Sequence, residues 1–324
     1  MRGELIPKFA PHTSIFSLEK FFVNSTLSDS GVARKRSRIE WRWGLFILPA
    51  LIFYLFVVVV PSFRGIAFAF TDWSGLKPSS KWIGFDQFRR IFEDGDSLGA
   101  LQHTIFLAIG ITIIQNLVGL LLALGVHSKI KSRNFLRVLF FAPAVVAPVA
   151  TAYLWQFLFA PNGPINAALS TVFSPSAAKE WLGDPKVVLW SIIIVVVWQF
   201  SGYSMVIFLA GLESVPEELL EAAELDGANY FYKFWYLVRH FLYPALTVTL
   251  MLSIIGGLKL FDQVYILTGG GPGQASQTIS TMMYRNAFQF GEFGYSTAMA
   301  VLLTLIVAIL SGIQYFGLSK TNKS

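Results

Sequence analysis

The sequence contains no cysteine and few charged residues. Without cysteine there can be no disulfide, thiolate metal site or cysteine nucleophile. Only 14% of the 324 residues are charged, whereas a soluble domain has about 25%. At the same time, 54% of the residues are hydrophobic. The composition therefore predicts an integral membrane protein. Its four histidines are scattered along the chain without metal-ligand spacing, so no metal site is expected.

The sequence also lacks the motif of a nucleotide-binding loop. A P-loop, G-x-x-x-x-G-K-[ST], holds phosphates with its backbone and its lysine, and the glycine-rich residues 269–273 are not followed by lysine. The neighbouring carboxylates Asp94 and Asp96 are interpreted as solvated charges, and no Ser-His-Asp set falls on one membrane face. We expect neither an enzyme active site nor a cofactor in this chain, so nucleotide has to be handled by another subunit.

Six apolar stretches are long enough to cross a bilayer, which takes about 20 mainly apolar residues. They are residues 44–62, 101–127, 135–159, 187–212, 241–260 and 295–318. They make residues 44–318 an all-α transmembrane domain between an N-terminal tail at 1–43 and a C-terminal end at 319–324. No apolar run precedes residue 44, so no signal peptide is expected. The basic residues 34–38 are interpreted as a membrane-flanking signal rather than as a nucleic-acid site.

Lysine and arginine predict the orientation in the membrane. If the N-terminal tail is inside, 16 of the 25 lysines and arginines fall in the tail and the inner loops. The other nine fall in the longer outer loops. The positive-inside rule then places both termini and residues 213–240 in the cytoplasm.

Residues 214–244 form a charge-dense segment between two apolar runs. Its first residues have the chemistry of a helix start, because Ser214 is a suitable N-cap and Glu217 lies at capping-box spacing from it. Pro216 is tolerated in a first turn. Gly227 is a typical residue to end the helix in a left-handed conformation. We therefore expect a short helix with a glycine stop.

The acidic character of this helix argues for a protein partner. Helices that lie on the cytoplasmic leaflet are usually rich in lysine and arginine, because the leaflet is negative. The carboxylates of Glu217, Glu218, Glu221 and Glu224 would be repelled from it. Small residues allow a partner to approach closely, and Ala222 and Ala223 lie among these carboxylates. The segment is therefore predicted to dock onto a protein rather than onto lipid.

Glu221-Ala222-Ala223, followed after three residues by Gly227, resembles the EAA loop of membrane subunits of binding-protein-dependent ABC importers. Residues 159–166 (FAPNGPIN) and 267–272 (LTGGGP) are similar to the carbohydrate-uptake branch of that family. The resemblance covers residues 45–318 and implies a type I ABC importer permease fold with six transmembrane helices. One departure is that Arg239-His240 replaces the family's Leu-Pro pair. The helix after the loop is therefore expected to run straighter or to break later.

The resemblance also implies the partners and the task of the chain. It would be a permease subunit in a bacterial cytoplasmic (inner) membrane, paired with a second homologous permease. An ABC ATPase dimer would bind Mg-ATP, and an extracytoplasmic solute-binding protein would deliver the substrate. An oligosaccharide is favoured over glycerol phosphate, with an acidic oligosaccharide such as alginate fragments as an alternative. The residues implied to dock the ATPase are Glu217, Glu218, Glu221, Ala222, Ala223, Asp226 and Gly227.

Polar residues inside the spans are candidates for the substrate pathway, since such residues are costly in a membrane and often functional. The candidates are Gln199, Tyr203, Ser253 and Asn286. The alternative is that they join neighbouring helices, which serine and threonine do more often. No span carries a central Asp or Glu, and proton-coupled carriers typically use one in a relay. This disfavours the main alternative function, a stand-alone secondary sugar carrier. A membrane-embedded enzyme is the third hypothesis.

Overall fold

The computed structural model describes residues 41–75, 79–128 and 130–321. Apart from one isolated β-bridge between Thr71 and Trp82, the regular structure of these residues is helical, which confirms the predicted all-α class. The chain divides at residue 60 into two compact units, residues 1–60 and 61–324, which are considered separately. Most of the predicted N-terminal tail, residues 1–40, lies outside the described residues.

The first unit holds the start of one long apolar helix. α2 (Trp41–Tyr54) continues through a π-helical turn, η1 (Leu55–Val59), into α3 (Val60–Phe68). Residues Phe46–Phe68 are long and apolar enough to cross a membrane. The helix extends six residues beyond the predicted span, which ends at residue 62.

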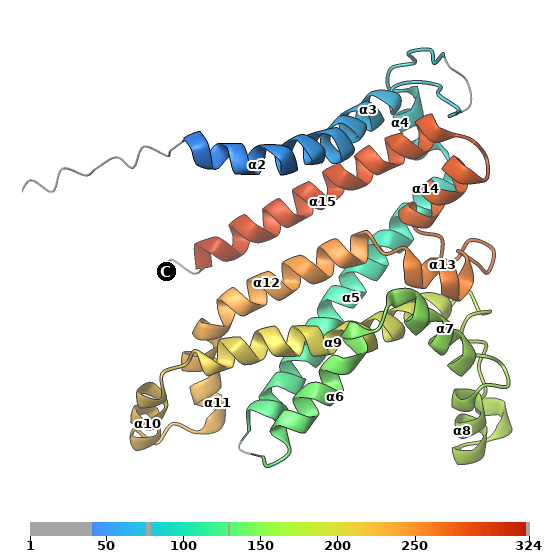
Figure 1. The fold of residues 1–324 in the computed structure, drawn as a ribbon. Helices are drawn as coiled ribbons and strands as arrows, with labels where there is room; N and C mark the ends of the chain where they lie inside the picture. Colours follow the sequence, from blue (N-terminus) through green and yellow to red (C-terminus); the bar gives the residue numbers. More distant parts are fainter. Residues whose placement is uncertain (1–40, 76–78, 129, 322–324) are drawn as a thin grey trace, which may run out of the picture. The chain divides into compact units, whose positions relative to one another are not determined.

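The second unit contains four long helices and one bent pair, together with shorter helices (Figure 1). The long helices are α5 (Gly95–His127), α9 (Val188–Glu213), α12 (Arg239–Leu258) and α15 (Phe293–Thr321). The bent pair consists of α6 (Arg133–Val145) and α7 (Pro148–Leu158). Counted with the first helix, the described residues contain five helices that could span a membrane, or six if the bent pair is one span.

The third predicted span, residues 135–159, is not one straight helix. α6 and α7 meet at an angle of 98°. Pro148 is the first residue of α7, and Ala147 before it has an extended backbone with ψ 135°. A proline disfavours helical backbone in the residue before it and is well suited to the first helical position. The local sequence therefore ends one helix and begins another within three residues.

The helix after the acidic segment does not break at Arg239-His240. Short α11 (Tyr230–Lys233) passes through a π-helical turn, η3 (Phe234–Val238), into α12, which continues through Pro244. A π-helical turn inserts an extra residue into a helix without ending it. Residues Tyr230–Leu258 consequently form one candidate span, so the helix runs on where the family's Leu-Pro pair is missing.

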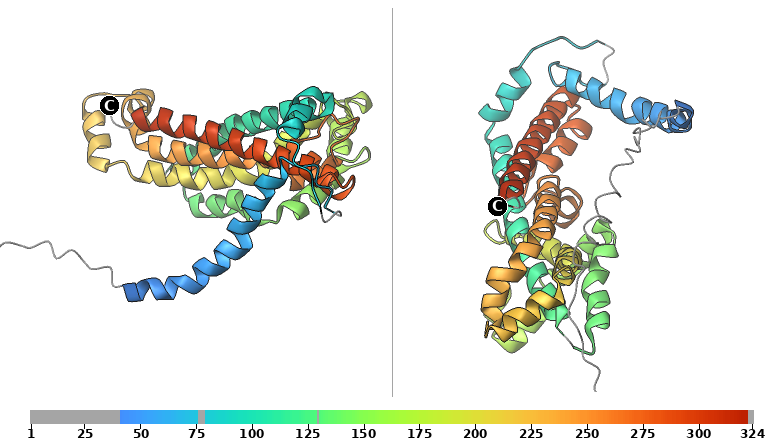
Figure 2. Two further views of the ribbon diagram at one scale, coloured as in Figure 1. Left: turned by 90° about the horizontal axis from the view of Figure 1, so that it is seen from above. Right: turned by 90° about the vertical axis from the view of Figure 1, so that its left-hand side faces the viewer.

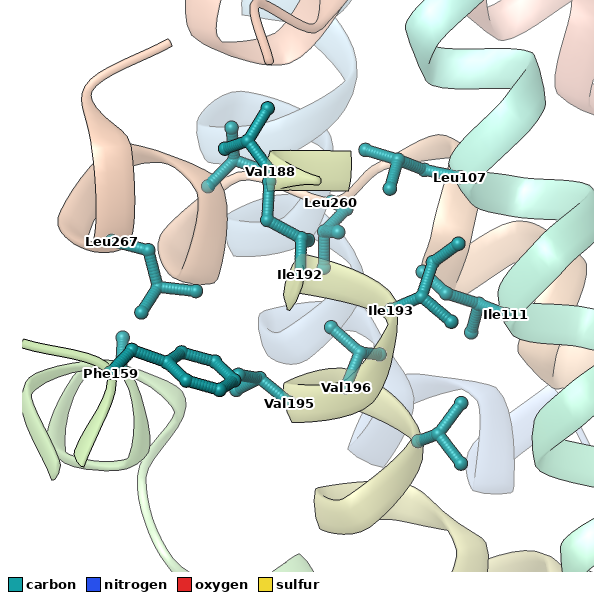
Figure 3. Close-up of a cluster of buried hydrophobic side chains, with 13 residues drawn as sticks. Leu107, Ile111, Phe159, Val188, Ile192, Ile193, Val195, Val196, Leu260 and Leu267 are labelled. Atoms are coloured by element: carbon teal, nitrogen blue, oxygen red, sulfur yellow. The ribbon is translucent and has the colours of Figure 1, made fainter. Parts of the chain in front are cut away.

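α9 is the most buried of the candidate spans. Its residues Ile192 and Val196 pack with Leu107 and Ile111 of α5 in an apolar cluster at the N-terminal half of α9 (Figure 3). Gly119 of α5 lies so close to α9 that an added Cβ would sit 2.6 Å from the Cβ of Ser204. Small residues at helix contacts allow such close packing in membrane proteins. The second unit is therefore built around α9.

The connections of the second unit gather at its two ends (Figures 1 and 2). One end carries the turn between α5 and α6, the segment from α10 (Glu217–Leu225) to α11, and the last turn of α15. The other end carries the shorter helices α4 (Asp86–Glu93), α8 (Pro164–Val172), α13 (Asp262–Thr268) and α14 (Ile279–Phe288). The two ends thus differ in architecture, and the acidic segment belongs to the first.

Candidate functional site

The acidic segment folds into a short, exposed helix, α10 (Glu217–Leu225), that buries none of its residues. Leu219 is 43% exposed and Leu225 is 90% exposed. Glu217 and Glu218 lie in the first turn, where the helix dipole favours carboxylates. Helices shorter than about 12 residues are marginal in water by themselves. A nine-residue helix that offers both leucines and carboxylates to the outside is suited to a protein partner.

Local contacts explain where α10 begins and ends, and its first residue is set differently from the prediction. The expected N-cap at Ser214 is wrong, because its hydroxyl donates to the carbonyl of Gly211 at 2.7 Å and so ends α9. Pro216 takes the N-cap position without a side-chain hydrogen bond. At the other end, Gly227 has φ +78°, and the amide of Ala228 donates to the carbonyl of Ala223 at 2.9 Å. This is the pattern of a glycine stop.

Two ion pairs flank α10. Arg137 of α6 donates from Nη2 to Oε1 of Glu213, the last residue of α9, at 2.8 Å. Lys233 of α11 donates to Oε1 of Glu224 at 2.6 Å. Both pairs are partly exposed, and such pairs add little to stability. A cavity of about 510 Å³ lies between α10 and the adjoining ends of α5, α6 and α9, so α10 is joined to the unit at its flanks rather than along its length.

A second candidate site is a cavity of about 440 Å³ lined by α5, α6, α7, α9 and α12 and by the residues that follow α12. Tyr203 and Ser253 both line it. Tyr203 is 43% exposed, whereas Ser253 is 5% exposed and receives a hydrogen bond from Asn116 at 2.9 Å. The structure therefore brings two of the four predicted pathway residues together.

The pathway candidates chosen from the sequence leave out several polar residues of this cavity, namely Gln115, Lys259, Asp262 and Gln263. The last two fall beyond the fifth predicted span, which ends at residue 260. In the structure α12 ends at Leu258 and α13 begins at Asp262, so the break itself lies on the cavity wall. A lysine and an aspartate three residues apart at the end of a span were the available signal. Within the described part of the chain, no three histidine, aspartate or glutamate side chains are grouped to hold a metal ion.

Gln199 lies behind the wall of this cavity rather than in it. Its side chain is fully buried. Its amide nitrogen donates to the carbonyl of Val146 at 2.9 Å, and its amide oxygen accepts from Gln263 at 3.0 Å. Buried amides need such partners. Gln199 thus ties the bend between α6 and α7 to the start of α13.

Asn286 lies in a different pocket, of about 390 Å³, near the end of the unit that carries α4 and α14. It is 7% exposed. Arg90, which also lines this pocket, forms an ion pair with Glu292 at 2.9 Å and lies over the ring of Tyr295 at 4.1 Å. The structure does not bring Asn286 together with Tyr203 and Ser253.

Aromatic rings continue from the cavity of Tyr203 and Ser253 toward α14. Phe261 lines the cavity and stacks on Tyr265, with ring centroids 5.2 Å apart. The ring of Tyr284 lies 5.1 Å from that of Tyr265. A hydrogen bond with Tyr284 raises the pKa of Tyr265. A tyrosine phenol is neutral at physiological pH in any case, so the cluster offers aromatic faces without charge.

Comparisons with known sequences identify the family of the chain. Residues 115–320 match the family described as "Binding-protein-dependent transport system inner membrane component". The chain is 36% identical over 276 residues to the probable starch degradation products transport system permease protein AmyD of Thermoanaerobacterium thermosulfurigenes, covering 85% of this chain and 93% of the relative. It is 30% identical over 288 residues to the trehalose/maltose transport system permease protein MalF of Thermococcus litoralis, covering 86% and 94%.

The fold is also similar to a solved structure. A chain in the crystal structure of a bacterial alginate ABC transporter, in complex with an alginate pentasaccharide-bound periplasmic protein, matches with a TM-score of 0.77 at 21% identity. The match covers 88% of this chain and 96% of that one. The relatives are named as transport permeases and not as enzymes. The chain therefore belongs to the family of binding-protein-dependent transport system inner membrane components, the permease subunits of ABC importers.

Proposed function

We propose that this chain forms half of the translocation pathway of an ATP-driven oligosaccharide importer and binds its ATPase through α10. The observation that carries the proposal is α10 itself, an exposed helix of nine residues that is acidic and has no buried residue. A helix this short is marginal by itself in water, so an exposed one gains stability when a partner covers it. Its position between α9 and α11 lets a rigid-body movement of the partner reach two membrane-spanning helices.

Energy has to reach the pathway from a separate subunit. The sequence lacks a P-loop, so Mg-ATP is bound by the partner ATPase in this proposal. Glu221 is exposed on α10 and is the residue proposed to anchor the helix in the ATPase. Gly227 sets the direction in which the chain leaves α10, because its left-handed backbone closes the glycine stop.

The cavity of Tyr203 and Ser253 is the proposed sugar pathway. It combines an aromatic ring with hydrogen-bonding groups, a combination that suits a ligand with apolar ring faces and many hydroxyls. Lys259 and Asp262 are its charged residues and offset each other. A neutral oligosaccharide is therefore favoured, in line with relatives named for starch degradation products and for trehalose and maltose. An acidic oligosaccharide such as an alginate fragment would need an excess of positive charge.

The remaining partners follow from the family. They are a second, homologous permease, an ABC ATPase dimer and an extracytoplasmic solute-binding protein, assembled in the bacterial cytoplasmic membrane. We place both termini in the cytoplasm. The distribution of lysine and arginine supports this orientation. For the C-terminus, so does the position of the last turn of α15 at the same end of the second unit as α10 (Figure 1).

Reconstitution tests this proposal. The chain is assembled in liposomes with its partner permease, ATPase and binding protein, and uptake of labelled maltotriose and of an alginate trisaccharide is measured together with ATP hydrolysis. The expected result is that binding protein loaded with the neutral sugar stimulates hydrolysis, and only in the complete assembly. Uptake by this chain alone, driven by a sodium or proton gradient, would refute the proposal.

A further inference from the structure

α6 and α9 are fastened to each other at two places inside the bundle. Gly202 of α9 lies directly against the carbonyl of Phe140 in α6, with no room for a Cβ. At the end of α6, the fully buried Gln199 donates to the carbonyl of Val146 at 2.9 Å. Both contacts hold the backbone of α6, one through steric fit and one through a hydrogen bond. The two helices are therefore locked together from the middle of α6 to the bend.

The ion pair between Arg137 and Glu213 is a third attachment, at the end nearest to α10. Its two atoms, Nη2 and Oε1, are 2.8 Å apart, and the two side chains are 41% and 56% exposed. A pair with this exposure contributes little to folding. It can still set the angle between α6 and the last turn of α9, because it lies beyond the contact at Gly202.

α10 has few other ways to move the rest of the chain. It buries no residue, so its displacement enters the second unit through the chain on either side and through the flanking ion pairs. Glu213 stands where α9 ends and leads into α10. Arg137 lies seven residues before Ala144, which is two helical turns, or about 10 Å along α6. Ala144 lines the cavity of Tyr203 and Ser253.

We propose that Arg137 and Glu213 are positioning residues of the transport cycle. Their ion pair makes α6 and α9 turn as one lever, so that displacement of α10 shifts the cavity wall at Ala144 and at the bend. Neither residue lines that cavity, so they act through α6 rather than on the sugar. The inference rests on the proposed function, since it takes α10 as the helix that the ATPase moves.

Charge reversal tests this lever in the complete transporter. Arg137→Glu, Glu213→Arg and the double exchange are reconstituted in liposomes with the partner permease, ATPase and binding protein. The measured quantity is labelled maltotriose imported per ATP hydrolysed. Each single reversal is expected to lower this ratio by about fivefold or more, the lower end of typical coupling between distant sites. The double exchange restores the ion pair with its charges swapped, and its ratio is expected to return to near that of the unchanged transporter.

Arg133→Glu is the matched control. Arg133 lies one turn before Arg137 on α6 and lines the same cavity of about 510 Å³, but it forms no ion pair within the described residues. The same charge change at this position is expected to leave the ratio unchanged. If the Arg133→Glu variant also lowered the amount of sugar imported per ATP, negative charge near α10 in general would be the cause, and the inference would be overturned.

Three outcomes contradict the lever. They are a normal ratio in both single variants, a double exchange as defective as the singles, and a loss in the control as large as at Arg137. If a reversal prevents assembly, Arg137→Gln and Glu213→Gln replace it in a double-mutant cycle, and purely additive effects then overturn the inference. If the unchanged complex shows no sugar-stimulated ATP hydrolysis, the proposed function fails. If the unchanged complex couples sugar uptake to ATP hydrolysis and only the variants depart from expectation, the role of the Arg137–Glu213 pair is rejected and the proposed function stands.

Discussion

Replacing Gly227 by valine tests whether the turn after α10 presents that helix to its partner. Gly227 has φ +78°, a backbone conformation that costs other residues energy because their Cβ approaches the neighbouring carbonyl. A Cβ built at this position meets nothing within 4 Å. The effect of a substitution therefore comes from backbone strain and not from a collision with the rest of the chain.

The size of the effect follows from that strain. A left-handed backbone costs a non-glycine residue about 1–2 kcal/mol, and a β-branched residue such as valine is disfavoured more strongly than alanine. Asparagine tolerates this conformation better. A difference of 1–2 kcal/mol changes an equilibrium by about 5–30-fold. Because the strained turn can relax when α10 is free, the affinity for the ATPase is expected to fall in the order Gly, Asn, Ala, Val at position 227.

The assay is titration of the purified ATPase onto the permease pair in lipid nanodiscs, followed by uptake measurements in liposomes. Gly227→Asn is the matched control, since it adds a side chain without the full strain. Equal affinity for the glycine and valine forms would refute the reasoning. An asparagine form as weak as the valine form would also refute it, because side-chain bulk rather than backbone conformation would then be decisive.

Three further predictions concern the two candidate sites. Glu221→Lys reverses a charge on the exposed α10 and is expected to abolish ATPase binding without unfolding the chain; normal uptake would contradict it. Gln199→Leu leaves the buried amide of Gln263 without its acceptor, which costs about 1–3 kcal/mol, so the unfolding temperature is expected to fall, and an unchanged temperature would argue against the network. Tyr203→Ala is expected to reduce sugar uptake while ATPase binding persists, whereas Tyr153→Ala, on α7 and outside the cavity, is the control and is expected to behave as wild type.

Several features could be predicted because they depend on local sequence. The all-α class follows from long apolar runs with few charges, because a helix forms all its backbone hydrogen bonds within one membrane-spanning segment. Gly227 is recognisable because glycine readily adopts the left-handed conformation that ends a helix. The family was likewise visible in a short motif whose residues lie close together in the chain.

Other features depend on contacts that local sequence does not contain. Ser214 has the residue type and spacing of an N-cap for α10. Its hydroxyl instead donates a hydrogen bond to the carbonyl of Gly211 in the preceding helix. Polarity alone predicts Gln199 as a pathway residue, yet its two hydrogen-bond partners lie 53 and 64 residues away in the sequence. The bend at Pro148 had a local signal, because the proline and the residue before it together favour a break. Its angle of 98° depends on packing against the rest of the unit.

Site-specific cross-linking at α10 tests the central claim most directly. The chain has no cysteine, so Ala222→Cys provides one thiol for a maleimide photo-crosslinker on the exposed surface of α10. Phe173→Cys, at a residue that is 75% exposed just after α8, places the same probe at the opposite end of the second unit. In the assembled transporter, the probe at position 222 is predicted to cross-link to the ATPase and the probe at 173 is not. A cross-link to the ATPase from position 173 and none from position 222 would contradict the account.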